Sequence, residues 1–521
     1  MIPRLLNRSF IRLAKIGLGL SKNLRVTPVI EIHRQKHFGS QLNRGQSKGK
    51  KRHEFREVKS NDEENEDESS DLMKTLNNLE YETIVSSAMH VSNRQIEQEI
   101  FIIQPYIKWG PRKSNSKPDH QLNEAEALIR SIPNWNIAQS VKIGVDNFDK
   151  RTVFGPGQLE NFKAIISKSK NTKNRITAVF VSKGMLSRHQ KLSLEQDFGV
   201  PVLDRYSVVI QILRLHATSA EAKLQVAMAE IPYIWTQMGD LDSKGVAKGQ
   251  VFYTDAQKEL LKRREVKIKE ELQRIRSQRM LLRRKRTNKN FPIVAVVGYT
   301  NAGKTSLIKA LTNEESMQPK NQLFATLDVT SHAGLLPCKL NVIYMDTVGF
   351  MSDIPTQLIE CFIATLEDAM LADVILHVQD IAHENYEAQK KHVESTLEDL
   401  FNKMSDDHQE GHLPPVINVG NKIDLFQGDI EQFSEMEVVS SKTFSGINDL
   451  LQTLENAILQ TTKRRKMTIK VRSGGEESAW LYKNTAVTHT EEDPKSSEHI
   501  LMHVVISDPT LQQFRHKFIG S

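Results

Sequence analysis

A glycine-rich stretch in the middle of the chain carries the residue types that bind phosphate. GYTNAGKT, residues 298–305, matches the pattern G-x-x-x-x-G-K-[ST] at every fixed position. The apolar run FPIVAVVG before it predicts a strand, and a helix is expected from about Lys304. Backbone N–H groups of such a loop and of the helix N-terminus face phosphates. The expected contact residues are Gly298, Tyr299, Thr300, Asn301, Ala302, Gly303, Lys304, Thr305 and Ser306.

Four positions have the chemistry of a magnesium–triphosphate site. Lys304 would supply a cation to the β- and γ-phosphates, and Thr305 a hydroxyl ligand to Mg²⁺. DTVG, residues 346–349, places Asp346 at the end of the predicted strand LNVIYM, where it can hold Mg²⁺ through water. LFATLD contains Thr326, which would complete the metal shell. Phe324, Ala325, Thr347, Val348 and Gly349 complete the expected contacts on this side.

Two later stretches favour guanine over adenine. NKID, residues 421–424, follows the strand-like PVINVG, and the Asp424 carboxylate can accept both guanine N1–H and the exocyclic N2–H₂. Adenine does not offer that pair of donors. SSK, residues 440–442, would close the base pocket. The expected base-side contacts are Asn421, Lys422, Asp424, Ser440, Ser441 and Lys442.

The residue after DTVG is apolar. Many GTPases place a glutamine here that orients the attacking water, and Phe350 cannot do so. No catalytic residue is therefore assigned from the sequence, and isolated hydrolysis is expected to be slow.

The rest of the chain must position these motifs. Its 521 residues suggest roughly three domains at about 150 residues each. Only two cysteines occur, Cys338 and Cys361, too few for a disulfide framework. The net charge of +7 sums a basic start, an acidic run and a very basic stretch. No run approaches the roughly 18 apolar residues of a membrane span.

The sequence of the N-terminal quarter predicts a targeting presequence and a linker. Residues 1–40 are rich in arginine and lysine, carry no acid before Glu31 and fit a mitochondrial presequence, the alternative being a basic tail without an address. Residues 41–118 contain dense runs of like charge and are expected to be a largely disordered linker.

The remaining segments predict an α/β multi-domain protein. Residues 119–238 alternate helix and strand patterns, which indicates a small parallel α/β domain. Residues 239–290 predict a basic helical linker with an apolar seam at Leu261, Ile268, Ile275 and Leu282. Residues 291–462 predict a P-loop GTPase domain, a mainly parallel sheet with helices on both faces, and residues 463–521 a small α+β appendage.

Taken together, GYTNAGKT, LFATLD, DTVGF, NKID and SSK resemble the HflX family of ribosome-associated GTPases. TLEDAMLADVILHVQD, residues 365–380, is similar to a family-typical stretch. VLDRYSVVIQIL and EAKLQVAMAEIPY resemble the family's N-terminal domain, so the resemblance covers about 340 residues. With its presequence the chain looks most like the animal mitochondrial member.

The resemblance implies a GTPase that hydrolyses GTP to GDP and phosphate, binds the large ribosomal subunit and its rRNA, and acts in ribosome recycling or late subunit assembly. From the presequence we expect it in the mitochondrial matrix, and we expect a monomer. It also implies that an apolar residue at Phe350 is usual. In related GTPases that use potassium, an asparagine at the place of Asn301 coordinates K⁺; alternatively Asn301 only shapes the loop. The loop 242–256 lacks the acidic residue of the family's GxGE pattern, which leaves its role open.

Two other functions remain open from the sequence. The chain could be a GTPase that assists RNA modification, or a nucleotide-dependent binding module with little hydrolysis. The stretch from Lys258 to Lys289 is strongly basic and poor in acids, which favours contact with an RNA backbone over a solvated helix face. His377 and His383 flank Asp380, but packing is the expected role of these histidines, not a metal site.

Overall fold

The computed structural model describes residues 79–89, 97–109, 117–171, 174–238, 254–288, 291–314, 317, 323, 330–351, 370–407, 413–494 and 496–519. The predicted presequence, most of the predicted linker, the loop 242–253, Cys361 and the segment Phe324–Thr326 lie outside the described residues. Among those described, no helix combines the length and apolar character that crossing a membrane requires.

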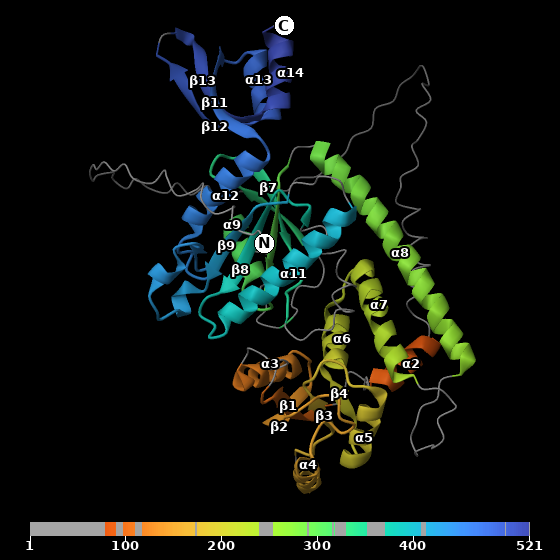
Figure 1. Ribbon diagram of the computed structural model, residues 1–521. Coiled ribbons are helices and arrows are strands. Elements are labelled where there is room, and N and C mark those ends of the chain that lie inside the picture. Colours follow the sequence, from red (N-terminus) through yellow and green to blue (C-terminus); the bar gives the residue numbers. More distant parts are fainter. Residues whose placement is uncertain are drawn as a thin grey trace, which may run out of the picture. The chain divides into compact units, whose positions relative to one another are not determined.

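The first sheet is small and parallel, as the helix–strand alternation predicts (Figure 1). Its strand order is β2-β1-β3-β4. Pairing is parallel throughout, with Ile100 opposite both Ile137 and Ala178. The strands are β1 (Gln98–Ile107), β2 (Trp135–Val145), β3 (Ala178–Val181) and β4 (Val202–Asp204).

The predicted linker 41–118 needs correction at its C-terminal end. It contains α2 (Leu79–Met89) and β1, and β1 is a central strand of the sheet. IFII, residues 100–103, is an uninterrupted apolar run, which is typical of a strand buried on both faces, and all four side chains are fully buried. The charge of the preceding segment obscured this short run.

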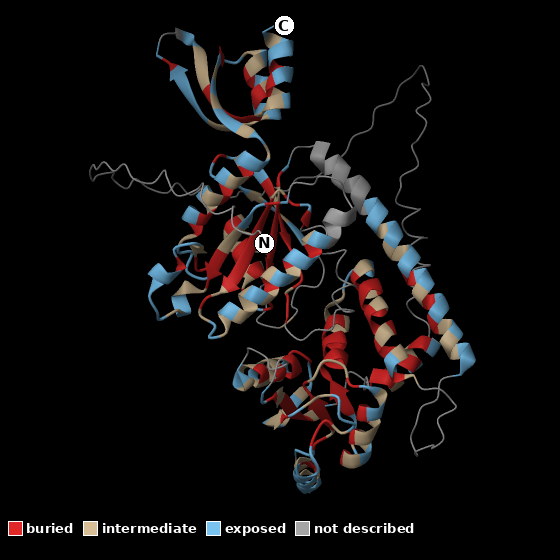
Figure 2. Ribbon diagram, in the orientation of Figure 1, coloured by how far each residue is buried: buried red, intermediate tan, exposed pale blue. Residues whose placement is uncertain are grey.

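Alternate side chains of these strands pack on opposite layers of helices. Phe101 and Val179 belong to a buried cluster with side chains of α4 and α5, whereas Ile102 and Phe180 belong to a cluster with side chains of α3 and α6. The helices are α3 (Pro118–Arg130), α4 (Pro156–Ser169), α5 (Arg188–Phe198) and α6 (Arg205–His216). Figure 2 shows the strands as the buried centre of this region.

The basic linker is one helix, α8 (Asp255–Asn288), packed along α7 (Ala220–Gln237). Two positions of the predicted seam, Leu261 and Ile268, are fully buried, and Ile268 packs against Leu224 and Ile231 of α7. Arg264 lies over the ring of Tyr81 in α2, 3.6 Å from its centroid. The seam therefore serves packing within the chain.

The second sheet has six strands in the order β10-β9-β8-β5-β7-β6. All neighbouring pairs are parallel except β6 with β7. The strands are β5 (Ile293–Gly298), β6 (Thr330–Leu335), β7 (Asn341–Asp346), β8 (Val374–Asp380), β9 (Val416–Asn421) and β10 (Glu437–Val438). Helices α9 (Lys304–Thr312) and α12 (Ile447–Thr461) cover one face, and α11 (Tyr386–Asp407) covers the other.

The last segment folds as an α+β unit. Strands β11 (Arg464–Arg472), β13 (Ser496–Ser507) and β12 (Ala486–Asp493) form an antiparallel sheet in that order. Helices α13 (Glu476–Asn484) and α14 (Asp508–Phe518) pack on one face through Leu481, Leu511 and Phe514.

Candidate nucleotide-binding site

The predicted motifs meet at the carboxyl edge of the six-stranded sheet. The phosphate loop follows β5, DTVG follows β7, and NKID begins at the end of β9. The register aligns Val296 with Asp346 and Gly298 with Val378, and Asp380 at the end of β8 with Asn421. Open α/β sheets bind ligands at this edge.

The phosphate loop has a backbone that only certain residues allow. Asn301 has φ 62° and Gly303 has φ 93°, both in the left-handed region. A Cβ on Gly303 would also collide with the side-chain amide of Asn421. A Cβ on Gly349 would collide with Thr300 and Lys304. The fixed glycines of the motifs are therefore needed for close packing around the loop as well as for its turn.

Lys304 begins α9 and is buried in the loop. Its Nζ donates to the carbonyl oxygens of Gly298 at 3.3 Å and Tyr299 at 3.1 Å. Burial lowers its pKa to about 8, although nearby Asp346 acts in the opposite direction. Both acceptors that the described residues offer this buried ammonium are neutral carbonyls, so an anion would stabilise it further and the loop favours a negatively charged ligand.

Thr305 and Asp346 lie against each other at the mouth of the loop. The Thr305 hydroxyl donates to Asp346 Oδ2 at 2.6 Å, and the Asp346 side chain is buried. A hydroxyl and a carboxylate are hard oxygen donors, which is the ligand chemistry of Mg²⁺. These two residues therefore fit the predicted metal, while Thr326 lies outside the described residues.

The DTVG segment is tied to the phosphate loop by its backbone. Thr300 N donates to Phe350 O at 2.7 Å, and Phe350 N donates to Gly298 O at 3.1 Å. The Phe350 ring is buried with Val348 in the hydrophobic core. Thr347 is also buried, and its hydroxyl donates to Val296 O at 2.8 Å. The side chains of Phe350 and Thr347 thus serve packing.

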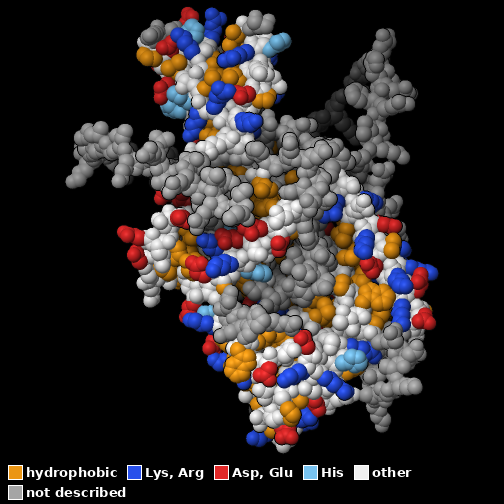
Figure 3. Space-filling view, viewed as in Figure 1, with side chains coloured by type: hydrophobic (Ala, Val, Ile, Leu, Met, Phe, Trp, Pro, Cys, Tyr) orange, Lys and Arg blue, Asp and Glu red, His pale blue; other side chains and the backbone are white. Residues whose placement is uncertain are grey.

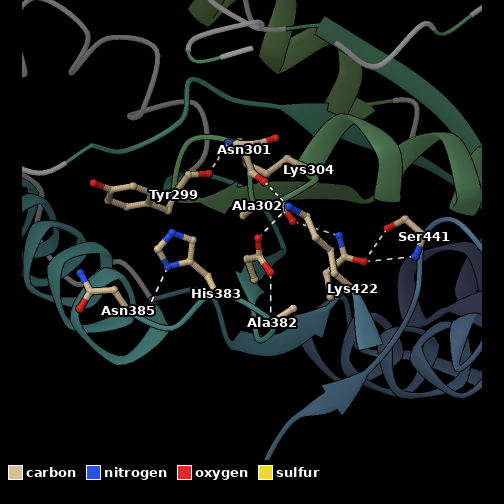
Figure 4. Close-up of polar contacts among 11 residues, drawn as sticks. Tyr299, Asn301, Ala302, Lys304, Ala382, His383, Asn385, Lys422 and Ser441 are labelled. Atoms are coloured by element: carbon tan, nitrogen blue, oxygen red, sulfur yellow. Dashed lines mark hydrogen bonds and ion pairs between the residues drawn. The ribbon is translucent and has the colours of Figure 1, made fainter. Parts of the chain in front are cut away.

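Two side chains of NKID form hydrogen bonds with the backbone of the phosphate loop (Figure 4). Asn421 Nδ2 donates to Ala302 O at 2.9 Å. Lys422 Nζ donates to Asn301 O at 2.9 Å. The side-chain oxygen of Asn421, Oδ1, accepts from both the backbone N–H and the hydroxyl of Ser441, at 3.1 and 2.8 Å. The loop, NKID and SSK therefore form one connected polar network.

The predicted base-reading carboxylate is held in place. Ser440 Oγ donates to Asp424 Oδ1 at 2.7 Å, and Ser440 is buried. Asp424 itself is exposed, and so is Lys442. An exposed carboxylate with one oxygen anchored can accept hydrogen bonds from a ligand with little reorganisation.

One residue of this network was missed by the motif analysis. Asp380 Oδ2 lies 2.7 Å from Lys422 Nζ. Its only signal in the sequence is its place at the end of an apolar strand. Among the described residues, His377 and His383 belong to no group of three or more potential metal ligands, and burial lowers the pKa of His377 to about 4.

Comparisons with known proteins agree with this geometry. Residues 293–413 match the family described as 50S ribosome-binding GTPase. Residues 119–213 and 216–286 match the families described as GTP-binding GTPase N-terminal and GTP-binding GTPase Middle Region. These three matches define a multi-domain P-loop GTPase.

Relatives narrow the class. The chain is 39% identical over 452 residues to GTP-binding protein 6 of Xenopus laevis, covering 84% of this chain and 83% of the relative. It is 31% identical to the GTPase HflX of Caldanaerobacter subterraneus, covering 67% and 80%. The chain belongs to the HflX family of GTP-binding proteins. A GTP-binding protein of Sulfolobus solfataricus, solved with GDP, is 21% identical over 70% of this chain and 99% of its own, with a TM-score of 0.38.

Proposed function

We propose that this protein hydrolyses GTP to GDP and phosphate with Mg²⁺, and that it acts on the large subunit of mitochondrial ribosomes in recycling or late assembly. The observation that carries the first part is the convergence of Lys304, Thr305 and Asp346 at one sheet edge, within 2.6 Å for the last two. Thr305 and Asp346 would hold Mg²⁺, which would neutralise charge on the phosphates.

Guanine would be read by Asp424, with Ser440 orienting its carboxylate at 2.7 Å. The loop residues from Gly298 to Ser306 would surround the phosphates through their N–H groups. The backbone ties of Phe350 would keep Gly349 beside the γ-phosphate. Phe324, Ala325 and Thr326 remain assigned to the metal side on their sequence pattern.

A group other than the Phe350 side chain must assist the attacking water, because the ring cannot form a hydrogen bond with it. Asn301 presents its side chain from an exposed, left-handed position in the loop, where an amide oxygen could coordinate K⁺. GTP hydrolysis is then faster in K⁺ than in Na⁺ at equal ionic strength, and Asn301→Ala removes the difference. Equal hydrolysis rates in the two salts would rule out K⁺ at Asn301 and would indicate that groups of the ribosome assist the attacking water.

The ribosomal partner is supported by the family description and by the charge of α8. In the described part of α8, acids are paired along the helix: Arg263–Glu259 at 3.0 Å, Lys269–Glu265 at 2.6 Å. Figure 3 shows basic and acidic side chains interspersed there. From Arg279 to Lys289 the sequence has six basic residues and no acid. We therefore expect the rRNA contact at the C-terminal end of the segment, from Arg279 to Lys289.

Charge reversal tests the contact. Arg283, Arg284 and Arg286 changed to Glu should weaken binding to purified large subunits and flatten the dependence of affinity on salt, because fewer counterions are released. Lys262, Arg263 and Lys269 changed to Glu are the matched control, from which we expect a smaller loss. If the two triple variants lost the same affinity for large subunits, α8 would be interpreted as a solvent-exposed helix without a specific RNA contact.

Cellular experiments separate the roles. Depletion should change the sedimentation profile of mitochondrial ribosomal subunits if the protein acts in splitting or assembly. An unchanged profile with altered rRNA modification would favour the modification GTPase. A GTPase rate that stays negligible with and without large subunits would favour the binding module.

Residues 1–40 fused to a reporter should direct the reporter to mitochondria. A reporter that stays in the cytosol would contradict the predicted presequence.

A further inference from the structure

Asp380 occupies a central place that no motif of the site explains. It is the last residue of β8, the strand that pairs with both the phosphate-loop strand β5 and the NKID strand β9. Its Oδ2 lies 2.7 Å from Lys422 Nζ, with only 13% of the Asp380 side chain and 25% of the Lys422 side chain exposed. Its Oδ1 accepts from the backbone N–H of Ala382 at 3.2 Å. Both carboxylate oxygens are therefore used.

Lys422 connects Asp380 to the phosphate loop. Its backbone is left-handed, with φ 67°, and its Nζ donates to Asn301 O at 2.9 Å while it pairs with Asp380. An ammonium has three donors, so two of them are committed to the protein before a nucleotide arrives. A flexible lysine fixed in this way needs little reordering when a ligand binds against it.

We propose that Asp380 is a positioning residue for guanine nucleotides: by holding Lys422, it preorganises both the phosphate loop at Asn301 and the base-reading segment. Asp380 acts through Lys422 and makes no contact with the reacting atoms. The inference rests on the proposed role of NKID as the base-reading segment. It predicts that the affinities for GDP and GTP gain alike, because Lys422 bonds to Asn301, whereas the DTVG segment, beside which the γ-phosphate would lie, bonds through Phe350 to Gly298 and Thr300.

A purely structural role for Asp380 would make a different prediction. If the carboxylate only capped the turn through Ala382, its loss would lower stability and leave the energetics of Lys422 unchanged. Asp373 provides the matched control at the opposite end of the same strand. Its carboxylate accepts from the backbone N–H of Ile293 at 2.7 Å, at the start of β5, whereas the phosphate loop follows the end of that strand.

The test is a double-mutant cycle in the full chain with fluorescent GDP and GTP. Asp380→Asn should raise both dissociation constants by about thirtyfold, the scale of a lost charged hydrogen bond, while kcat at saturating GTP stays within about twofold. Lys422→Met should cause a similar loss. In the Lys422→Met background, Asp380→Asn should change affinity by less than about twofold, since coupled residues are not additive. Asp380→Glu keeps the charge and should recover part of the affinity.

Each other result has a definite meaning. Additive losses in the cycle, or an Asp380→Asn affinity equal to that of Asp373→Asn, would overturn the inference. Nucleotide-free thermal unfolding identifies a variant that fails to fold, and Asp380→Glu then serves in its place in the cycle, with the same expected non-additivity. A wild-type chain that binds GDP and ADP equally would overturn the base-reading assignment itself, whereas guanine-specific binding that is unchanged in Asp380→Asn would overturn only the role of Asp380.

Discussion

The parallel N-terminal sheet and the mainly parallel six-stranded sheet each have a buried lysine on a neighbouring helix, and the two lysines have different surroundings. Lys191 in α5 donates from Nζ to Ala88 O at 2.7 Å and to Tyr233 Oη at 3.3 Å, and it lies 5.6 Å from the Tyr233 ring centroid. Among the residues that the structure describes, Lys304 donates to the carbonyls of Gly298 and Tyr299 in its own loop. Burial lowers the pKa of both.

The difference shows why burial and a lowered pKa do not by themselves identify a binding site. The partners of Lys191 come from α2 and α7, so its ammonium completes a packed interior. The partners of Lys304 belong to a left-handed, glycine-containing loop at the carboxyl edge of the sheet. Loop geometry and position at that edge distinguish the ligand site from the structural one.

The largest expected effect separates these two lysines directly. Lys304→Ala should weaken GTP binding at least about a hundredfold, because it removes the cation for the phosphates, with little loss of stability. Lys191→Ala should cost roughly 2–4 kcal/mol of unfolding free energy, since it opens a cavity and strands Ala88 O, and leave GTP affinity within about twofold. Fluorescent-nucleotide titration and denaturation of both variants provide the comparison. Loss of GTP affinity in Lys191→Ala, or loss of stability with normal GTP affinity in Lys304→Ala, would contradict the assignment of the two lysines.

The next largest effect concerns Asp424. Asp424→Asn places an amide donor opposite guanine, a loss of roughly 2–5 kcal/mol, or at least about thirtyfold in affinity. Xanthosine triphosphate carries a carbonyl where guanine carries its exocyclic amine, so it should bind the variant better than the wild type. Competition titration with both nucleotides measures this. Unaltered GTP affinity would mean that the base is read elsewhere.

The fixed motifs could be located from the sequence because their chemistry imposes spacing as well as residue type. Gly303, Lys304 and Asp424 fall where the motifs place them because glycine conformation, phosphate charge and base edge leave few alternatives. Asp380 could not be found in this way, since its partner Lys422 is 42 residues later and only strand register brings them together. Strand β1 was missed because its ten residues follow a charged segment that dominates the local composition.

His377 tests whether a buried titratable group near the site affects stability alone. It lies on β8 beside Val297 of β5, and burial lowers its pKa from 6.5 to about 4. The unfolded chain then binds more protons than the folded chain as pH falls below about 6.5. Stability is full above that pH and should drop by about 2 kcal/mol at pH 5.

Chemical denaturation of the wild type and of His377→Gln at pH 7 and pH 5 isolates this contribution. The variant should lose about 2 kcal/mol less than the wild type over that interval. Parallel slopes in the two proteins would mean that His377 does not titrate as its burial requires.

The smallest expected effect is a pH dependence of binding through Lys304. Its pKa is about 8 in the free protein, and bound phosphates favour the ammonium form. Binding therefore takes up a proton at high pH, and GTP affinity should fall about fourfold between pH 7 and pH 8.5. Lys304→Arg keeps its charge throughout and should show no such fall, whatever its absolute affinity. A flat wild-type profile would place the pKa of Lys304 well above that range.

Single-turnover release of phosphate measures the central claim, guanine-specific hydrolysis at this loop, most directly. The full chain with Mg²⁺ and large ribosomal subunits should release phosphate from GTP and leave ATP intact, and Lys304→Ala should release none from either nucleotide. Equal release from GTP and ATP, or release by Lys304→Ala at the wild-type rate, would contradict the assignment of this site.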